Sequence, residues 1–531
     1  MTGRSQKSER ETYCFQKKLI KYLLAFLFGG LMTVAYAPVE AWWFQIICLS
    51  GLFLLPKARI AEGFCIGFYF GLGWFSFGMW WVLPAIVRHS HTSWSIAFLL
   101  SSLLLVYLSL FPALAVSVLS ALNKYGSEQP HYFLLRCGTT ASVWALSEWF
   151  RGNLFSGFPW LATGYAQASG PLSSFASIAG IFGLTYLSAL CAAMLASVCK
   201  ELEQREYTKI IPLVILSLTA LYLAGQGLQR IEWTEGKGTL RVRLMQGNLS
   251  QQDKFSSIGV RQAIHTYGKL MSDSQAELTV LPETAIPIEW HSQSPELLDA
   301  WRKTATDRNT SILVGTVIST QKQERLMTTN SAIAMMPGSS SALAYDYRYD
   351  KQHLLPFGEF FPTGSRWIES ILDQNYSDFT SGNTYQAPLV INNKKIGVSI
   401  CFENLFDIGT LNRVGDGDTL ISISNFAWFL GSAAPAQHLQ IARVRAIELG
   451  RWVVQASNTG RTAMIDQHGR IRHALEEDVT GVLDGEIQLM TGKTPFMHFR
   501  NGPILFICFL QIIFLPFVYL GRKSKFKVRV C

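Results

Sequence analysis

The sequence predicts a membrane α-helical bundle of about eight transmembrane helices joined to an α/β domain on the extracytoplasmic side. Of 531 residues, 49% are hydrophobic and 16% are charged, a composition too apolar for an ordinary soluble protein. The apolar residues form long blocks before residue 226 and after residue 503, and a polar stretch between them is long enough to build its own core. Lys and Arg residues are concentrated beside the apolar blocks, and their distribution predicts which ends of the membrane helices face the cytoplasm.

Eight apolar segments are long enough, or nearly so, to cross ~30 Å of hydrocarbon. The second and fifth are short, and the fifth contains Glu148, so each of these two could instead lie at the interface or re-enter from one side. The segments are 19–37, 41–56, 60–83, 94–122, 137–150, 171–199, 210–225 and 503–520.

The positions of Lys and Arg favour an even number of spans. With the N-terminus inside, the short outer loops hold only Arg88 and Arg151, whereas the cytoplasmic segments are rich in Lys and Arg. Removing one helix would move the basic C-terminal tail to the outside. We therefore expect a cytoplasmic segment at 1–18, about seven helices at 19–226, an extracytoplasmic domain at 239–489, a last helix at 503–520 and a cytoplasmic tail at 521–531.

Composition and spacing exclude several classes of function. The net charge of +9 is explained by membrane orientation rather than by nucleic-acid binding. Eight of the nine cysteines lie in or beside apolar blocks or at the chain ends, and only Cys401 lies in the polar part, which excludes a disulfide framework there. No Cys or His cluster has the spacing of metal ligands, and no glycine-rich phosphate loop follows a strand, so we expect no metal and no cofactor.

Short β-branched runs alternate with helical stretches in the polar part, which is typical of a layered α/β domain. Helices are predicted at 259–274, 295–309 and 436–451. The predicted strands are 239–245, 277–281, 311–318, 330–336, 342–349, 395–401, 419–424 and 452–456.

Cys401 ends the predicted strand 395–401, and α/β folds place reactive groups at such strand ends. A helix that begins just after Cys401 would direct the positive end of its dipole at the sulfur and favour a thiolate. A lone cysteine is otherwise most often a small buried hydrophobic residue, and that alternative stays open.

Two charged residues, Glu283 and Lys351, also lie at or near the ends of predicted strands. Glu283 follows the apolar strand 277–281, and Lys351 precedes a loop punctuated by Pro and Gly. Each alone could be an ordinary solvated side chain. Together with Cys401 they supply a carboxylate to take a thiol proton, a thiolate to attack a carbonyl, and an ammonium to stabilise the oxyanion together with a backbone amide. The three residues therefore indicate nucleophilic acyl transfer.

Four short motifs carry the residues singled out above: Leu281-Pro282-Glu283, Asp350-Lys351 with Pro356-Phe357-Gly358-Glu359, Cys401-Phe402-Glu403 and Ser424-Asn425. In residue type, order and approximate spacing they resemble the nitrilase superfamily of carbon-nitrogen hydrolases. The apolar N-terminal half and the single C-terminal helix narrow the likeness to the apolipoprotein N-acyltransferase family, and the likeness covers almost the whole chain.

This resemblance implies a nitrilase-like αββα sandwich with a triad in which Glu283 is the general base, Lys351 the oxyanion lysine and Cys401 the nucleophile. It assigns supporting roles to Glu359 and Glu403, and Phe402, Asn425 and Trp428 become candidates for the oxyanion site or its loop. Relative to the family pattern, Phe402 stands in place of tyrosine, Phe426 in place of aspartate and Leu430 in place of glycine.

The implied reaction moves a fatty acyl group from a phospholipid, through a thioester on the cysteine, to the α-amine of a lipoprotein's N-terminal diacylglyceryl-cysteine. The implied setting is the bacterial inner membrane, with a multi-pass monomer whose catalytic domain is periplasmic. Two other readings remain: a membrane-anchored amidase that passes the thioester to water, and a non-catalytic scaffold with a nitrilase-like domain.

Two histidines allow further interpretations. His353 lies two residues after Lys351, so a papain-like Cys-His pair with Cys401 is a minor alternative. His438 is expected to be a polar residue on an amphipathic helix.

Overall fold

The computed structural model divides into two compact units. The helical unit comprises the chain up to Trp80, Phe98–Arg230 and the chain from Phe499 on; the α/β unit comprises Trp81–Ala97 and Ile231–His498. The structure describes residues 2–55, 57, 59–90, 92–122, 132–204, 210–251, 254–322, 325–339, 345–362, 364–365 and 378–527.

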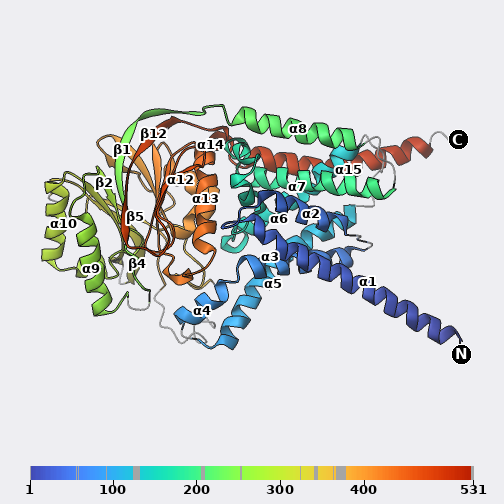
Figure 1. The fold of residues 1–531 in the computed structure, drawn as a ribbon, viewed down its shortest axis with the longest axis horizontal. Helices are drawn as coiled ribbons and strands as arrows, with labels where there is room; N and C mark the ends of the chain where they lie inside the picture. Colours follow the sequence, from blue (N-terminus) through green and yellow to red (C-terminus); the bar gives the residue numbers. More distant parts are fainter. Residues whose placement is uncertain are drawn as a thin grey trace. The chain divides into compact units, whose positions relative to one another are not determined.

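Each of the eight predicted apolar segments lies on a helix. Five of these helices are long and apolar enough to span a membrane, at Phe15–Ala35, Ile60–Gly78, Trp94–Leu122, Ser173–Glu203 and Ile211–Leu228, which makes this a multi-pass membrane protein. Two more apolar helices, Trp42–Leu54 and Gly502–Leu515, are shorter over the described residues. The eight helices are α1 (Thr2–Met32), α2 (Trp42–Leu54), α3 (Ile60–Gly78), α5 (Trp94–Leu122), α6 (Phe133–Asn153), α7 (Ala176–Gln204), α8 (Ile211–Leu228) and α15 (Gly502–Lys527), shown in Figure 1.

Small residues let the helices of this unit approach closely, as is common in membrane bundles. A Cβ on Gly29 of α1 would lie 2.0 Å from the carbonyl oxygen of Phe70, and one on Gly73 of α3 would lie 2.1 Å from that of Phe26. The last helix is held by polar contacts, because the side chain of Gln511 accepts a hydrogen bond from Ser142 Oγ at 2.7 Å.

The α/β unit contains two mixed six-stranded sheets. The first has the order β12-β1-β2-β3-β4-β5 and the second the order β11-β10-β9-β8-β7-β6. Strands β1, β2 and β3 are mutually parallel, as are β7, β8 and β9. Their bounds are β1 (Thr234–Gln246), β2 (Leu278–Val280), β3 (Ser311–Lys322), β4 (Arg325–Met335), β5 (Tyr347–Asp350), β6 (Leu389–Ile391), β7 (Lys394–Ile400), β8 (Thr419–Ser424), β9 (Val453–Ser457), β10 (Ala463–Ile465), β11 (Ile471–Ala474) and β12 (Gly481–Gly492).

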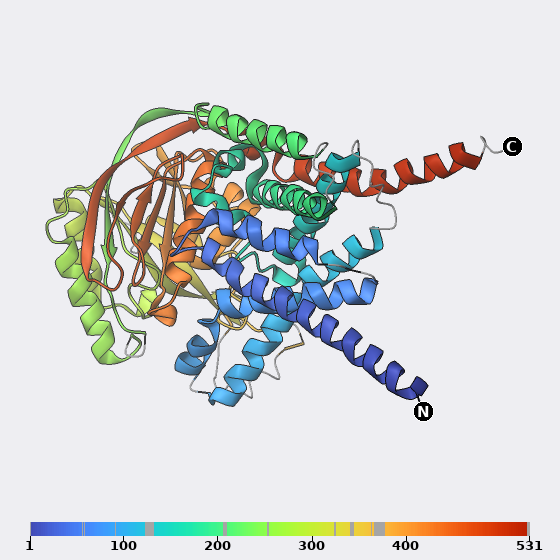
Figure 2. The ribbon, with the colours of Figure 1, turned by 45° about the vertical axis from the view of Figure 1, so that its right-hand side comes forward.

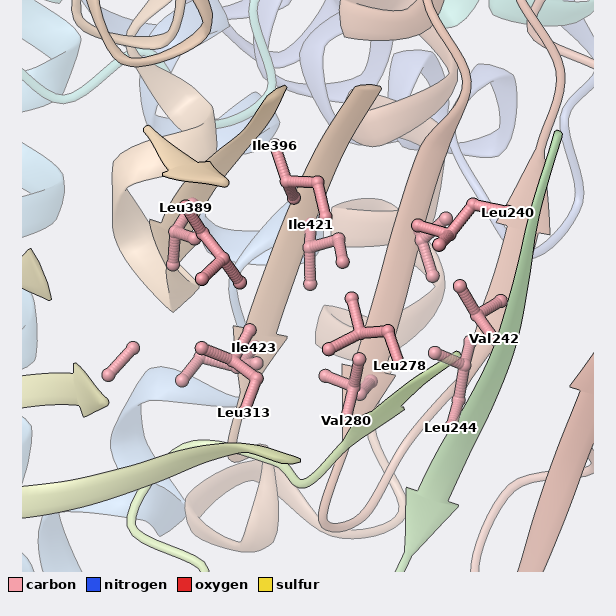
Figure 3. Close-up of a cluster of buried hydrophobic side chains, with 14 of the residues drawn as sticks. Leu240, Val242, Leu244, Leu278, Val280, Leu313, Leu389, Ile396, Ile421 and Ile423 are labelled. Carbon is pink, nitrogen blue, oxygen red and sulfur yellow. The ribbon is translucent and has the colours of Figure 1, made fainter. Parts of the chain in front are cut away.

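The two sheets pack face to face around one apolar core. Leu240 and Val280 from the first sheet and Ile396 and Ile423 from the second belong to the same buried cluster. Figure 3 shows these side chains between the strands of both sheets. Alternate residues of β7 face this core, which fixes the register of the strand that leads to Cys401.

Helices cover the outer face of each sheet and complete four layers (Figures 1 and 2). On the first sheet, α9 (Ser257–Met271) and α10 (Pro295–Asp307) bury Tyr267 and Trp301 against β3 and β4. On the second, α12 (Asp407–Val414) and α13 (Ala434–Leu449) pack on β8, β9 and β10. The observed layers are those of the sandwich that the sequence resemblance implied.

Most of the predicted strands and all three predicted helices are present within a few residues of the expected bounds. The prediction missed β6, β10, β11, β12 and α12. Of the predicted strand 342–349, residues 342–344 lie outside the described part of the chain, and the observed strand β5 begins at Tyr347.

Candidate active site

Cys401 is the first residue after β7 and adopts a strained backbone conformation. Its φ is +53°, a value that residues other than glycine seldom adopt. A short 3-10 helix, Cys401–Leu405, begins at the cysteine itself, and the α-helix α12 begins only at Asp407. The expectation that the strand gives way to a turn or helix at Cys401 is confirmed, and one tight 3-10 turn separates the strand from the α-helix.

Glu283 and Lys351 meet at the ends of two strands of the first sheet. The Lys351 Nζ lies 3.2 Å from Glu283 Oε1 and 2.8 Å from Glu359 Oε1. Lys351 is 2% exposed, Glu283 6% and Glu359 8%, so this is a buried charge cluster. Asn330 of β4 joins the two carboxylates, since its Nδ2 donates to Glu283 Oε1 and to Glu359 Oε1, at 2.8 Å each.

The approach of the Glu283 segment to β3 requires a glycine. A Cβ on Gly315 would lie 2.5 Å from the carbonyl oxygen of Pro282 and 2.6 Å from the Cα of Glu283. The Leu281 N–H continues the ladder with a 2.8 Å bond to the carbonyl of Leu313. The strand pairing thus carries Glu283 to the rim of the sheet, where its carboxylate reaches Lys351.

The charges in the cluster act directly on the cysteine. Burial raises the pKa of the Cys401 thiol and the negative charge of Glu283 adds to this effect, while Lys351 and the backbone N–H of Asn425 oppose it. Burial alone would lower the pKa of Lys351, but Glu283 and Glu359 outweigh it and the pKa is raised. These directions favour a protonated thiol and a charged ammonium in the resting site.

Glu403 ties the Lys351 strand end to the Cys401 strand end. Its Oε1 accepts from the Tyr349 hydroxyl at 2.9 Å and from the Gln352 N–H at 2.8 Å, and its Oε2 accepts from the Ile400 N–H at 2.8 Å. The carboxylate is fully buried and lies 3.6 Å from Arg413 Nη1. Glu403 therefore acts as a bracket between the two sheets.

The loop after β8 forms another wall of the site. Asn425 is held at both ends of its side chain, since its Nδ2 donates to Gln251 Oε1 at 2.9 Å and its Oδ1 accepts from Asn458 Nδ2 at 3.0 Å. Phe426, in the position where the resemblance expected aspartate, is 2% exposed, with its ring centroid 5.0 Å from that of His438. The Phe426 ring thus packs against His438 of α13.

The segment Trp81–Ala97 packs on the same loop from outside. The Trp81 ring lies edge-on to the Phe429 ring with centroids 4.9 Å apart, and Arg88 Nη1 donates to the Leu430 carbonyl at 3.4 Å. This segment contains α4 (Val82–Ser90). Trp428 lies in the 3-10 turn Ala427–Phe429 and is partly exposed.

Neither histidine forms a Cys-His catalytic pair. The His353 ring stacks on Phe406 with centroids 3.5 Å apart. His438 is fully buried, and its Nε2 donates to the Cys401 carbonyl oxygen at 3.0 Å rather than contacting the sulfur. Burial lowers the pKa of His438 to about 4, so the ring is neutral at neutral pH. The expectation of a polar residue on an amphipathic helix is wrong, because nearly all of α13 is buried.

The structure brings Glu283, Lys351 and Glu359 together within electrostatic reach of Cys401. Glu403 bonds to the N–H of Ile400 just before the cysteine, Phe402 is buried just after it, and the Asn425 backbone N–H bonds to the sulfur. Trp428 is not brought into these contacts by any described bond. Sequence reasoning missed Asn330 and Asn458, the two amides that hold the site together. Asn330 lies inside a strand and Asn458 just after one, at positions where a lone polar residue gives no distinctive pattern. Among the described residues, no group of three or more His, Cys, Asp or Glu could hold a metal ion.

Both parts of the chain match models of known protein families. Residues 28–194 match the model of the apolipoprotein N-acyltransferase N-terminal domain, and residues 241–494 match that of carbon-nitrogen hydrolases. An apolipoprotein N-acyltransferase from Ralstonia nicotianae is 35% identical over 91% of this chain and 90% of its own. The chain belongs to the apolipoprotein N-acyltransferase family.

Further relatives in this family have similar coverage. The apolipoprotein N-acyltransferase of Nitrosomonas europaea is 32% identical over 93% of this chain and 96% of its own. The one from Pseudomonas syringae pv. tomato is 33% identical over 92% of this chain and 95% of its own. The likeness thus extends over both the membrane part and the nitrilase-like part, and the chain is an enzyme of the nitrilase superfamily.

Proposed function

We propose that this enzyme transfers a fatty acyl group from a phospholipid to the α-amine of a lipoprotein's N-terminal diacylglyceryl-cysteine through a thioester on Cys401. One observation carries the assignment of residues: Lys351 Nζ lies 3.2 Å from Glu283 Oε1 at a buried strand end, and both charges act on the Cys401 sulfur. The family membership supports the choice of donor and acceptor.

In the first half-reaction, Glu283 takes the proton from the Cys401 thiol as the sulfur attacks the ester carbonyl of the phospholipid. A carbon-sulfur bond forms, and the carbonyl oxygen becomes an oxyanion that the Lys351 ammonium and the Phe402 backbone N–H stabilise. The oxyanion then collapses and the ester carbon-oxygen bond breaks. Glu283 returns its proton to the departing oxygen, which releases a lysophospholipid.

In the second half-reaction, the α-amine of the acceptor attacks the thioester carbonyl. Glu283 removes a proton from the amine, the same donors hold the oxyanion, and collapse forms the amide while the carbon-sulfur bond breaks. The sulfur recovers a proton from Glu283. Because the lysophospholipid leaves before the amine reacts with the acyl-enzyme, the cycle is ping-pong.

A membrane donor explains why the hydrolase-like unit is joined to several spanning helices. Each methylene of an acyl chain is worth ~0.8 kcal/mol of transfer free energy, so a phospholipid tail cannot be drawn fully into water. We infer an eight-span bacterial inner-membrane monomer with the α/β unit on the periplasmic side, as the distribution of basic residues favours.

To test the orientation, a cysteine placed at the exposed Asp307 in a Cys401→Ala chain should react with an impermeant maleimide in intact spheroplasts. Labelling only after lysis would refute it.

The activity is tested with purified protein, a phospholipid labelled in its acyl chain and a diacylglyceryl lipopeptide. We expect label on the protein before lipopeptide is added and on the lipopeptide amine afterwards, with neither product in the Cys401→Ala variant. Label released only as free fatty acid would favour a membrane-anchored amidase. Absence of any acyl-enzyme, with an unreactive Cys401 thiol, would favour the non-catalytic scaffold.

A further inference from the structure

The carbonyl oxygen of Cys401 is hydrogen-bonded by a side chain of α13. His438 of this helix is fully buried, and its Nε2 lies 3.0 Å from the Cys401 oxygen. A carbonyl oxygen only accepts hydrogen bonds, so the contact requires a proton on Nε2. Cys401 has a φ of +53°, a conformation that a residue with a side chain keeps only where its surroundings hold it. The bond from His438 is one of the contacts that hold it.

The peptide group that His438 contacts is also the one that carries the Phe402 N–H. The bond between Cys401 and Phe402 is trans, so its carbonyl and its N–H point in opposite directions. Because the carbonyl is directed at α13, the Phe402 N–H is directed away from that helix. In the proposed reaction this N–H stabilises the oxyanion. The orientation of the oxyanion donor is therefore fixed at the other end of the same peptide group.

A hydrogen bond to the Cys401 carbonyl also strengthens the Phe402 N–H as a donor. Electron density drawn toward the carbonyl oxygen leaves the amide proton more positive, and hydrogen bonds in a chain of this kind polarise one another in a buried site. Phe402 is 5% exposed and His438 is fully buried, so water screens the effect little. Both the direction and the polarity of the N–H thus depend on the contact with His438.

The His438 ring has a second oxygen neighbour, which competes for its proton. Gln455 of β9 donates from Nε2 to the Arg461 carbonyl at 2.8 Å, and its Oε1 lies 2.9 Å from His438 Nδ1. A neutral imidazole has one N–H for these two acceptors. Burial lowers the pKa of His438 to about 4, so the ring does not gain a second proton at neutral pH. The tautomer with its proton on Nε2 serves Cys401, and the other tautomer serves Gln455.

We propose that His438 is a positioning residue of the oxyanion site, which donates from Nε2 to the Cys401 carbonyl and thereby aims the Phe402 N–H at the oxygen of the reacting carbonyl group. It acts through a peptide group and not on the sulfur. The inference rests on the proposed function, because it assumes that the acyl group is transferred through an oxyanion at this peptide.

The test compares two reactions of Cys401 in the full-length protein. Single-turnover acylation by labelled phospholipid passes through an oxyanion, whereas alkylation by iodoacetamide does not. The alkylation rate is measured by mass spectrometry of the peptide that contains Cys401. Deletion of an oxyanion donor costs about 10²- to 10³-fold, so His438→Leu, which only misdirects one, should slow acylation by about 10- to 100-fold. Its alkylation rate should stay close to that of the unaltered protein.

Two conservative variants separate the two acceptors of the ring. The amide of His438→Gln reaches the position of Nε2 and should restore most of the acylation rate, whereas the amide of His438→Asn reaches the position of Nδ1 and should not. His438→Asn also supplies the loss of rate if His438→Leu does not fold. Leu439→Ala is the matched control, because Leu439 of the same helix packs in the apolar core against the second sheet. It should lower the Tm and leave the acylation rate in place.

Equal falls in acylation and alkylation would overturn the inference, since they would assign His438 to exposure or activation of the sulfur. An unchanged acylation rate in His438→Leu would overturn it as well. So would a rate in His438→Gln no higher than that in His438→Asn, because the ring proton would then not serve the Cys401 carbonyl. Absence of acyl-enzyme in the unaltered protein, with Cys401 still alkylated, would instead contradict the proposed function itself.

Discussion

Each unit of the molecule buries a carboxylate beside a cation, and the two clusters are built in different ways. In the helical unit, Glu148 and Arg151 lie one turn apart on α6, 3.7 Å from each other. Glu148 accepts from the Thr163 N–H at 2.8 Å, and Arg151 donates to the carbonyls of Phe158 and Trp160 at 2.7 and 2.8 Å. The pair is matched one to one and fastens the chain that follows α6 to that helix.

In the α/β unit, Glu283, Lys351 and Glu359 come from separate stretches of chain and are unequal in number. They bond to one another and to Asn330 rather than fastening a local loop. The first pair fastens a local loop, whereas the second group is assembled from distant strand ends and contains the proposed base. The comparison predicts that changes in one cluster alter stability and changes in the other alter the rate.

The largest effect is expected for Glu283→Gln. Without the base, acyl-enzyme formation should slow by about 10²- to 10⁴-fold with little change in thermal unfolding. The rate is measured in a single turnover with labelled phospholipid. Glu289→Gln is the control, since Glu289 caps a short helix elsewhere in the unit. A variant that keeps more than a tenth of the rate would show that another group accepts the thiol proton.

Glu148→Leu tests the other side of the comparison. It leaves the buried Arg151 without its carboxylate, so the free energy of unfolding should fall by about 3–5 kcal/mol. Thermal unfolding in detergent measures the change, and the double variant Glu148→Leu/Arg151→Leu should recover part of the loss. A normal melting temperature with a lost acylation rate would reverse the roles assigned to the two clusters.

Glu403→Gln is expected to have an intermediate effect on both properties. Both carboxylate oxygens accept backbone N–H groups, so an amide NH₂ must face a donor on one side. The mismatch should cost about 1–3 kcal/mol of stability and slow acylation by displacing Lys351 relative to Cys401. Urea unfolding and single-turnover rates check the two parts. An unchanged rate in a destabilised variant would show that the bracket serves folding alone.

The smallest effect is expected for Tyr349→Phe, which removes a hydrogen bond to the charged Glu403 and should cost about 1.5 kcal/mol of stability. Tyr347→Phe on the same strand is its matched control. The Tyr347 hydroxyl is buried with no hydrogen-bond partner among the described residues, so its removal should be neutral or stabilising. Equal losses of stability from both changes, measured by urea unfolding, would contradict the role of Glu403 as a link between the two sheets.

The sequence alone was enough to predict the strand ends that carry Glu283, Lys351 and Cys401. Glu283 and Cys401 each follow an apolar run whose burial is visible in residue type, so a polar residue at the end of the run is conspicuous. Lys351 instead follows a short strand of alternating Tyr and charged residues, Tyr347–Asp350. The strand β12 was missed because its residues are mostly half-buried or exposed and because it contains Gly485 between its terminal glycines, Gly481 and Gly492. Its pairing with β1 depends on the tertiary fold.

Other features of the site depend on packing that no local pattern reports. His438 was expected on the polar face of an amphipathic helix, yet almost every side chain of α13 is buried. The positive φ of Cys401 and the short 3-10 turn after it arise from the bonds of Glu403 and His438 to this corner.

The division of the cluster between two sheets has a consequence for the newly made protein. Glu283 and Lys351 belong to one sheet and Cys401 to the other, so none of the half-domains contains a complete set of reacting groups. In the proposed reaction, a chain that has formed only its first sheet would lack the sulfur, and one that has formed only its second would lack the base. Acylation would therefore require that both sheets of the sandwich are assembled.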